Sequence, residues 1–168
     1  MFVLVVSVVL VGVLGLLNLL LMTAVIRRLR THTTQLAVLT RGNPDLELLQ
    51  PGTRLPAFTA PVARPEVIAF LSTSCDLCLI QAPELARYLR EHGVARDTAL
   101  VVIAGDGPAG QELTDRLDAV ATVVREPADG PVTSAFGVRL FPTFYAVGDG
   151  RVRSGAISVD QLPVPAAV

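Results

Sequence analysis

The chain has 168 residues, a formal net charge of −1, 51% hydrophobic residues and a mean hydropathy of +0.55. This length allows one domain with an appendage, and the near-neutral charge argues against a nucleic-acid-binding protein. The hydrophobic excess is concentrated at the N-terminus, where residues 1–26 contain no charged side chain.

Residues 1–26 are long enough to span a membrane, since a helix of that length measures about 39 Å and a bilayer core about 30 Å. A secretory signal peptide is the alternative, but the segment lacks a positive start, a short apolar core and an A-x-A-like site. We therefore expect a single-pass transmembrane anchor over 1–26 and a juxtamembrane linker over 27–50. Arg27, Arg28 and Arg30 follow the anchor, and the positive-inside rule would place everything after them in the cytoplasm.

The remaining residues show the periodicities of an α/β domain. Continuous apolar runs predict buried strands, and a 3.6-residue period predicts helices. The expected strands are 66–71, 98–104, 121–124, 144–147 and 151–153, with a further edge strand at 58–60. The expected helices are the segment from Cys75 to His92-Gly93, then 111–120 and 132–136.

Strands alternate with helices until Gly148-Asp149-Gly150, which indicates a hairpin turn. This order predicts a mixed sheet flanked by helices, with an antiparallel edge. Pro163 and Pro165 leave little room for a final helix. One face of the sheet should then be incompletely covered, and we expect apolar surface there for a partner or the membrane.

Cys75 and Cys78 are the only cysteines and lie where a predicted strand ends and a helix begins. We expect no metal site, because His32 and His92 do not complete a four-ligand set with them. A disulfide that closes so short a loop stabilises little, so a redox role is favoured over a structural one. Unpaired N–H groups at the helix start favour a thiolate. The spacing predicts Cys75 as the nucleophile and Cys78, one turn further on, as the resolving cysteine.

Two prolines complete the pattern. Pro83 falls inside the helix that follows the cysteines, where it removes one backbone hydrogen bond. Pro142 lies in Phe141-Pro142-Thr143, between the short helix and the hairpin. The bond before it can be cis or trans, and spacing alone does not decide between them.

On these motifs the chain resembles the membrane-anchored thioredoxin-like thiol-disulfide oxidoreductases of the TlpA/ResA/MauD type. The resemblance spans roughly residues 51–155 and rests on a Pro-Gly…Leu-Pro-Ala-Phe lead-in, the strand–Cys75-Asp76-Leu77-Cys78–helix unit with Pro83, the segment 136–144, and the hairpin. It implies a thioredoxin-like domain over 51–168, protein thiols and disulfides as substrates, and no cofactor. It also implies that Pro142 is cis, faces the cysteines, and holds substrate through the backbone of Phe141. The resemblance also implies a redox partner in the membrane and a domain on the extracytoplasmic side. The arginines after the anchor indicate the opposite side, the cytoplasm.

Several positions depart from the family pattern. Ser74 replaces a tryptophan, Asp76-Leu77 replaces a proline-containing dipeptide, Ala69 replaces an Asp or Asn, and Gln81 replaces an acidic residue. The usual acid–base partner of the buried cysteine is therefore missing, and Asp76 and Glu84 are the nearest carboxylates in the sequence.

Two alternative functions stay open. A peroxiredoxin-like peroxidase on the same fold would use Ser72 as its hydroxyl, although Ile68 stands where such enzymes carry a proline. A non-enzymatic adaptor, in which the cysteines only sense redox state, would explain the missing carboxylates.

Overall fold

The computed structural model describes residues 1, 2, 6, 10, 12 and 48–164. The chain divides into two compact units, Met1–Leu46 and Glu47–Val168. Most of the predicted anchor over 1–26 and most of the predicted linker over 27–50 lie outside the described residues. No helix formed by the described residues is long and apolar enough to cross a membrane.

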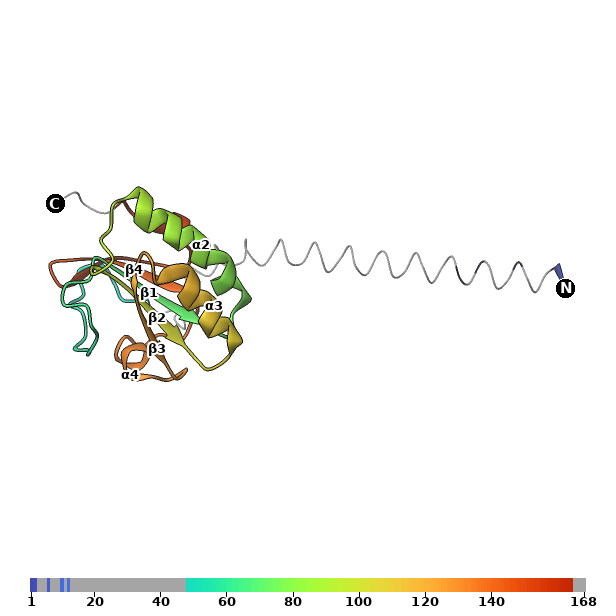
Figure 1. Ribbon diagram of the computed structural model, residues 1–168, viewed down its shortest axis with the longest axis horizontal. Helices are drawn as coiled ribbons and strands as arrows, with labels where there is room; N and C mark the ends of the chain where they lie inside the picture. The colour runs from blue at the N-terminus through green and yellow to red at the C-terminus, as the bar shows by residue number, and fades with distance from the viewer. Residues whose placement is uncertain (3–5, 7–9, 11, 13–47, 165–168) are drawn as a thin grey trace. The chain divides into compact units, whose positions relative to one another are not determined.

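The second unit is built on one five-stranded sheet with the order β3-β2-β1-β4-β5 (Figure 1). Its strands β1 to β5 are Val67–Ser72, Ala99–Ala104, Thr122–Glu126, Thr143–Gly148 and Arg151–Ala156. β1, β2 and β3 are parallel to one another, and β4 is antiparallel to both of its neighbours, β1 and β5. All residues of β1 and β2 are buried, which explains why their sequences are apolar without alternation.

Helices cover both faces of this sheet. α2 (Asp76–Glu91) and α3 (Pro108–Leu117) pack on one face, and α4 (Pro131–Ala135) lies on the other (Figure 1). β1 divides its side chains between two core clusters: Val67, Ala69 and Leu71 face α2, whereas Ile68 and Phe70 face the cluster that includes Val132 of α4. The predicted α/β fold with a mixed sheet is confirmed.

The predicted element boundaries differ in informative ways. α3 begins three residues earlier than expected because Pro108 occupies its first position, where a missing N–H costs nothing. β3 continues through Arg125 and Glu126, which pair with Ile103 and Ala104 despite their charge. β5 continues to Ala156, which pairs with Phe144.

The predicted edge strand at 58–60 is wrong. Phe58 instead packs its ring against Phe136, with 5.2 Å between centroids. The segment that pairs with β5 lies earlier, where Arg54 forms an isolated antiparallel bridge with Arg151. Within the predicted linker, Leu48 and Leu49 pack against the Phe58 side of the core, and the Leu49 N–H donates to the Tyr145 hydroxyl at 3.3 Å.

Among residues 48–164, no strand carries an exposed large apolar side chain, so the expected apolar surface on one face of the sheet is also wrong. The chain after β5 forms one 3₁₀ turn, η2 (Val159–Gln161), just before Pro163. Val159 and Leu162 enter the core cluster beneath α2 and provide the missing cover. Within 48–164, the exposed large apolar side chains are Leu77, Ile80, Leu140 and Val164, none of them on a strand.

A buried carboxylate holds α4 in place. Glu126, at the end of β3, is 7% exposed and accepts the backbone N–H groups of Val132 and Thr133 at 3.0 and 2.7 Å. It also accepts the Thr133 hydroxyl at 2.5 Å. A side chain at Gly130 would overlap the Glu126 carboxyl, so the glycine leaves room for it. Glu126 thus anchors the start of the segment that leads to Phe141 and Pro142.

Candidate functional site

The two cysteines lie where the sequence predicts them, after the last residue of β1 and in the first turn of α2. A turn closed by the Cys75 N–H and the Ser72 carbonyl, 3.3 Å apart, connects the two elements. Cys75 is the N-cap of α2 and is partly exposed, whereas Cys78 is fully buried. Both are free thiols.

The Cys75 sulfur lies between two backbone groups. The Cys78 N–H donates to Cys75 Sγ at 3.2 Å, as a capping side chain accepts at a helix start. On the other side, the Cys75 thiol donates to the Phe141 carbonyl at 3.4 Å. Cys75 is therefore partly exposed and has its sulfur held at the start of the helix, which is a suitable position for a nucleophile.

The Cys78 thiol has different surroundings. Burial raises its pKa strongly, and the hydrogen bond that the Cys78 thiol donates to the Cys75 sulfur adds to the effect. The Ser72 N–H, 3.4 Å from Cys78 Sγ, lowers the pKa by less. In the described part of the chain, none of the groups that shift this pKa is a carboxylate. Cys78 therefore keeps its proton at neutral pH.

The structure places the backbone of Phe141, one of the two predicted substrate-binding residues, beside Cys75. The Phe141–Pro142 bond is cis, and the Phe141 carbonyl contacts Cys75. Pro142 is buried and Phe141 is partly buried. Pro83 lies inside α2 and is exposed, which makes it a feature of the helix.

Exposed apolar side chains lie along the segments that carry this site. Leu77, Ile80 and Leu140, which we call the apolar rim, are 40%, 62% and 38% exposed. Leu77 and Ile80 are three apart on α2 and share one side of it. Leu140 directly precedes Phe141. No pattern in the sequence marks these three residues, because the exposure of a side chain is not visible in a sequence.

Ser72, the residue whose hydroxyl a peroxidase would use, contacts Ser74. Their hydroxyl oxygens lie 3.0 Å apart, and the Ser74 N–H donates to Ser72 Oγ at 3.3 Å. The Ser72 hydroxyl is thus engaged with Ser74, whereas a peroxidase would aim it at Cys75.

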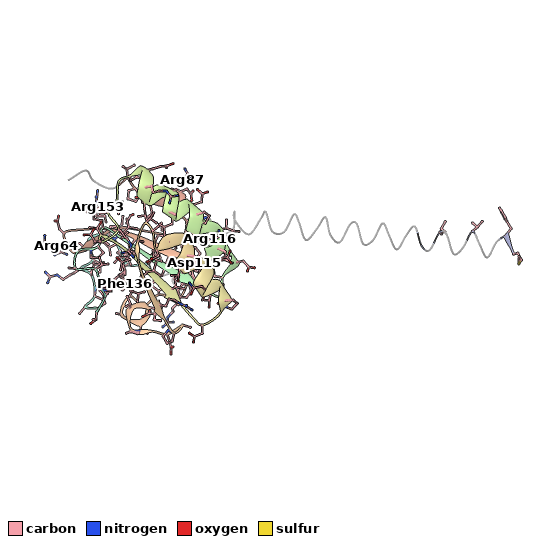
Figure 2. All side chains as sticks on the ribbon, viewed as in Figure 1. Arg64, Arg87, Asp115, Arg116, Phe136 and Arg153 are labelled. Atoms are coloured by element: carbon pink, nitrogen blue, oxygen red, sulfur yellow. The ribbon has the colours of Figure 1, made fainter. Side chains whose placement is uncertain are left out.

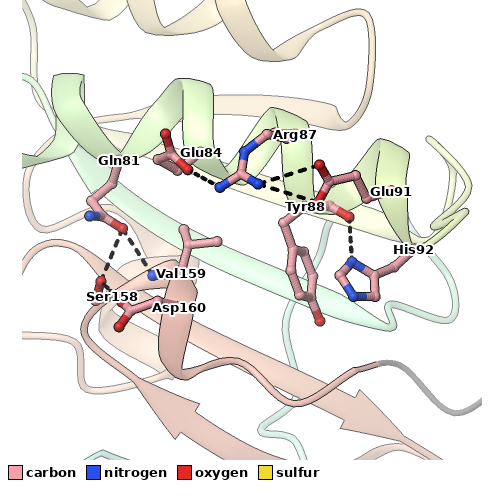
Figure 3. Close-up of polar contacts among 9 residues, drawn as sticks. All are labelled: Gln81, Glu84, Arg87, Tyr88, Glu91, His92, Ser158, Val159 and Asp160. Atoms are coloured by element: carbon pink, nitrogen blue, oxygen red, sulfur yellow. Dashed lines mark hydrogen bonds and ion pairs between the residues drawn. The ribbon is translucent and has the colours of Figure 1, made fainter.

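Gln81 contacts η2, the 3₁₀ turn near the C-terminus (Figure 3). The family that the sequence resembles carries an acidic residue at this position. Its Oε1 accepts the Val159 N–H at 2.9 Å and the Ser158 hydroxyl at 3.4 Å. The contact ties α2 to η2 across 78 residues of sequence. Gln81 therefore stabilises the fold in place of an acid–base role.

This assignment predicts different results for two substitutions at Gln81. Gln81→Ala should lower the free energy of unfolding by about 1 kcal/mol, the usual net value of such a hydrogen bond. Gln81→Glu keeps an oxygen that accepts both donors and should be nearly neutral. Denaturant unfolding of the two variants measures the difference, and equal stability for both would contradict it.

No group of three or more His, Cys, Asp or Glu side chains suited to a metal ion occurs in the part of the chain that the structure describes.

No protein-family model matches the sequence, and a search of curated proteins finds no match. Solved structures do resemble the fold. One is the thioredoxin domain of a thiol-disulfide oxidoreductase from Bacteroides vulgatus, with a TM-score of 0.53 and 16% identity over 67% of this chain and 91% of that one. Another is a thioredoxin-family thiol:disulfide interchange protein from Chlorobium tepidum, with a TM-score of 0.50 and 15% identity over 65% and 87%.

A third, dsbF of MTB, has 26% identity over 56% of this chain and 70% of that one, with a TM-score of 0.47. The chain therefore has a thioredoxin-like fold, and the structures it resembles are thiol-disulfide oxidoreductases.

Proposed function

We propose that this protein is a thiol-disulfide oxidoreductase that acts on protein substrates. The observation that carries the proposal is the asymmetry of the dithiol on a thioredoxin-like fold. Cys75 is accessible and capped by an N–H group, whereas Cys78 is buried one turn away. Thiol-disulfide exchange needs one accessible thiol that attacks the substrate and a second thiol nearby that releases it.

The reaction follows from these positions. The Cys75 thiolate attacks one sulfur of a substrate disulfide, forms a mixed disulfide, and releases the other substrate sulfur as a thiolate. Cys78 loses its proton to solvent and attacks Cys75 Sγ. The Cys75–Cys78 disulfide forms, and the substrate leaves with both sulfurs reduced. Two electrons pass from the dithiol to the substrate, and the reverse sequence oxidises a substrate dithiol.

The surroundings of Cys75 support polypeptide substrates. The apolar rim offers contacts to side chains that are exposed in unfolded or extended segments. The Phe141 backbone lies beside Cys75, where it can pair with the backbone of such a segment. We assign Phe141 and Pro142 to substrate binding on this basis.

Insulin reduction with dithiothreitol as the electron donor tests the proposal. The wild-type full chain in neutral detergent should accelerate the precipitation of reduced insulin, and Cys75→Ser should not, because it lacks the nucleophile. Equal rates for the two proteins would exclude the enzymatic function and favour the redox-sensing adaptor.

The raised pKa of Cys78 predicts how the resolving step depends on pH. A thiol that titrates above the working range gains about tenfold in thiolate for each pH unit. The step should therefore accelerate about tenfold per unit between pH 6 and 9. Release of thionitrobenzoate from a mixed disulfide on Cys75, followed at several pH values, measures it. A plateau below pH 8 would mean that another group lowers the pKa of Cys78.

We further propose that the protein is of the TlpA/ResA/MauD type, tethered by residues 1–26 with its domain on the extracytoplasmic side. The apolar N-terminal segment and the motifs around the cysteines support this. Disulfide chemistry is also favoured outside the cytoplasm. A membrane-impermeant maleimide reports the side directly, since Cys75 and Cys78 are the only cysteines. Labelling in intact cells is expected; labelling only after lysis would place the domain in the cytoplasm.

A further inference from the structure

A large groove lies at the end of the sheet where β1 begins. It has a volume of about 1310 Å³, and its walls come from residues 54–67, Thr98 and the β4–β5 hairpin. Val67, the first residue of β1, lines the groove, whereas Ser72, the last, contacts the Cys78 thiol. A six-residue strand covers about 17 Å. The groove is therefore a separate site from the dithiol.

Four arginines line this groove: Arg54, Arg64, Arg151 and Arg153. Figure 2 shows Arg64 and Arg153 at the same end of the domain. Among the described residues, the ion-paired arginines are Arg87, Arg96 and Arg116, and all four groove arginines lack such a partner. Glu66 and Asp149 also line the groove, so its formal charge is positive.

Two of these arginines are held in position. Arg151 donates to the Gly52 carbonyl at 2.8 Å, and its backbone pairs with Arg54. The Arg153 stem lies over Gly148, where an added Cβ would come within 2.8 Å of the arginine Cδ. Gly148 thus makes room for Arg153. Less side-chain entropy is lost on binding when guanidinium groups are positioned in advance.

The lining of the groove indicates what it binds. Guanidinium groups recognise carboxylates with paired hydrogen bonds. Leu55 and Phe58, which are partly exposed, also line the groove and offer an apolar floor that a simple inorganic ion would not use. The volume also exceeds the usual 300–1,000 Å³ or so of a small-molecule pocket.

A long polyanion such as nucleic acid fits less well, since residues 48–164 carry more acidic than basic side chains. We propose that the groove binds an acidic polypeptide segment of a partner protein, with aspartate or glutamate side chains on the arginines and apolar side chains on the floor.

Fluorescence anisotropy with a labelled Glu/Leu peptide, and a Lys/Leu peptide as the control probe, tests this on the full chain in neutral detergent. The acidic peptide alone should bind, and more weakly as salt is raised. Arg64→Gln with Arg153→Gln should weaken binding about tenfold or more, because charge-assisted hydrogen bonds are lost. The matched variant, Arg90→Gln with Arg125→Gln, removes two exposed arginines outside the groove and should bind as wild type.

Thermal unfolding verifies that both double variants are folded. Cys75→Ser should bind the peptide unchanged, which separates this site from the redox function. Equal affinity of the two double variants would overturn the proposal. The proposal would also be overturned if Arg64→Gln with Arg153→Gln bound the acidic peptide as wild type does but lost binding to phosphatidylglycerol vesicles. The groove would then recognise a lipid surface.

Discussion

Replacing Cys78 by serine is expected to convert the protein into a trap for its substrates. Cys75 retains its accessible position and attacks a substrate disulfide, but no second thiol is present to release the mixed disulfide. Intramolecular attack by a well-placed group is equivalent to an external concentration of about 10⁵ M or more. Millimolar dithiothreitol cannot replace it, so insulin turnover should fall by about two orders of magnitude or more.

The mixed disulfides are measured by non-reducing electrophoresis of cell extracts, followed by mass spectrometry of the bands that disappear on reduction. Cys75→Ser with Cys78→Ser is the matched control, because it retains every other contact surface and cannot form a disulfide. Adducts of equal abundance on Cys78→Ser and on the double variant would contradict the assigned roles. The proteins captured by Cys78→Ser alone would be the substrates.

Much of the site could be predicted because its signals are local. Cys75 and Cys78 lie at a strand end and a helix start that apolar runs and periodicity reveal, and both elements are present. The cis bond before Pro142 was decided by the resemblance and not by spacing. The position of the Phe141 carbonyl beside Cys75, 66 residues apart in sequence, followed only from the resemblance.

The features that sequence reasoning missed depend on contacts between distant residues. The structural role of Gln81 could not be predicted, because its hydrogen-bond partner, Val159, is 78 residues away in the sequence. The arginine groove combines residues of the lead-in with others of the hairpin, about a hundred positions later. α3 begins before residue 111, where the apolar periodicity predicts its start, because proline is well tolerated at the first position of a helix and Pro108 occupies it.

The role of Glu126 could not be predicted from the sequence, because a charged residue at the end of a strand normally faces solvent. Removing its carboxylate should lower the free energy of unfolding more than any other charge substitution described above. Glu126→Ala leaves the buried N–H groups of Val132 and Thr133 without a partner. Hydrogen bonds to a charged group contribute about 1.5–3 kcal/mol each, and their losses are not additive. We expect the free energy of unfolding to fall by about 3 kcal/mol, with a decrease in melting temperature of about 10 °C.

Glu126→Gln sharpens the test, because the amide keeps one acceptor oxygen but turns an N–H group toward a backbone N–H. It should lose about half as much stability as Glu126→Ala. Asp97→Ala removes an exposed carboxylate for which no contact is seen and should change stability by less than about 0.5 kcal/mol. Urea unfolding of the three variants measures the series. If Glu126→Ala were as stable as Asp97→Ala, the carboxylate would not be what holds α4, and the segment leading to Phe141 would need another anchor.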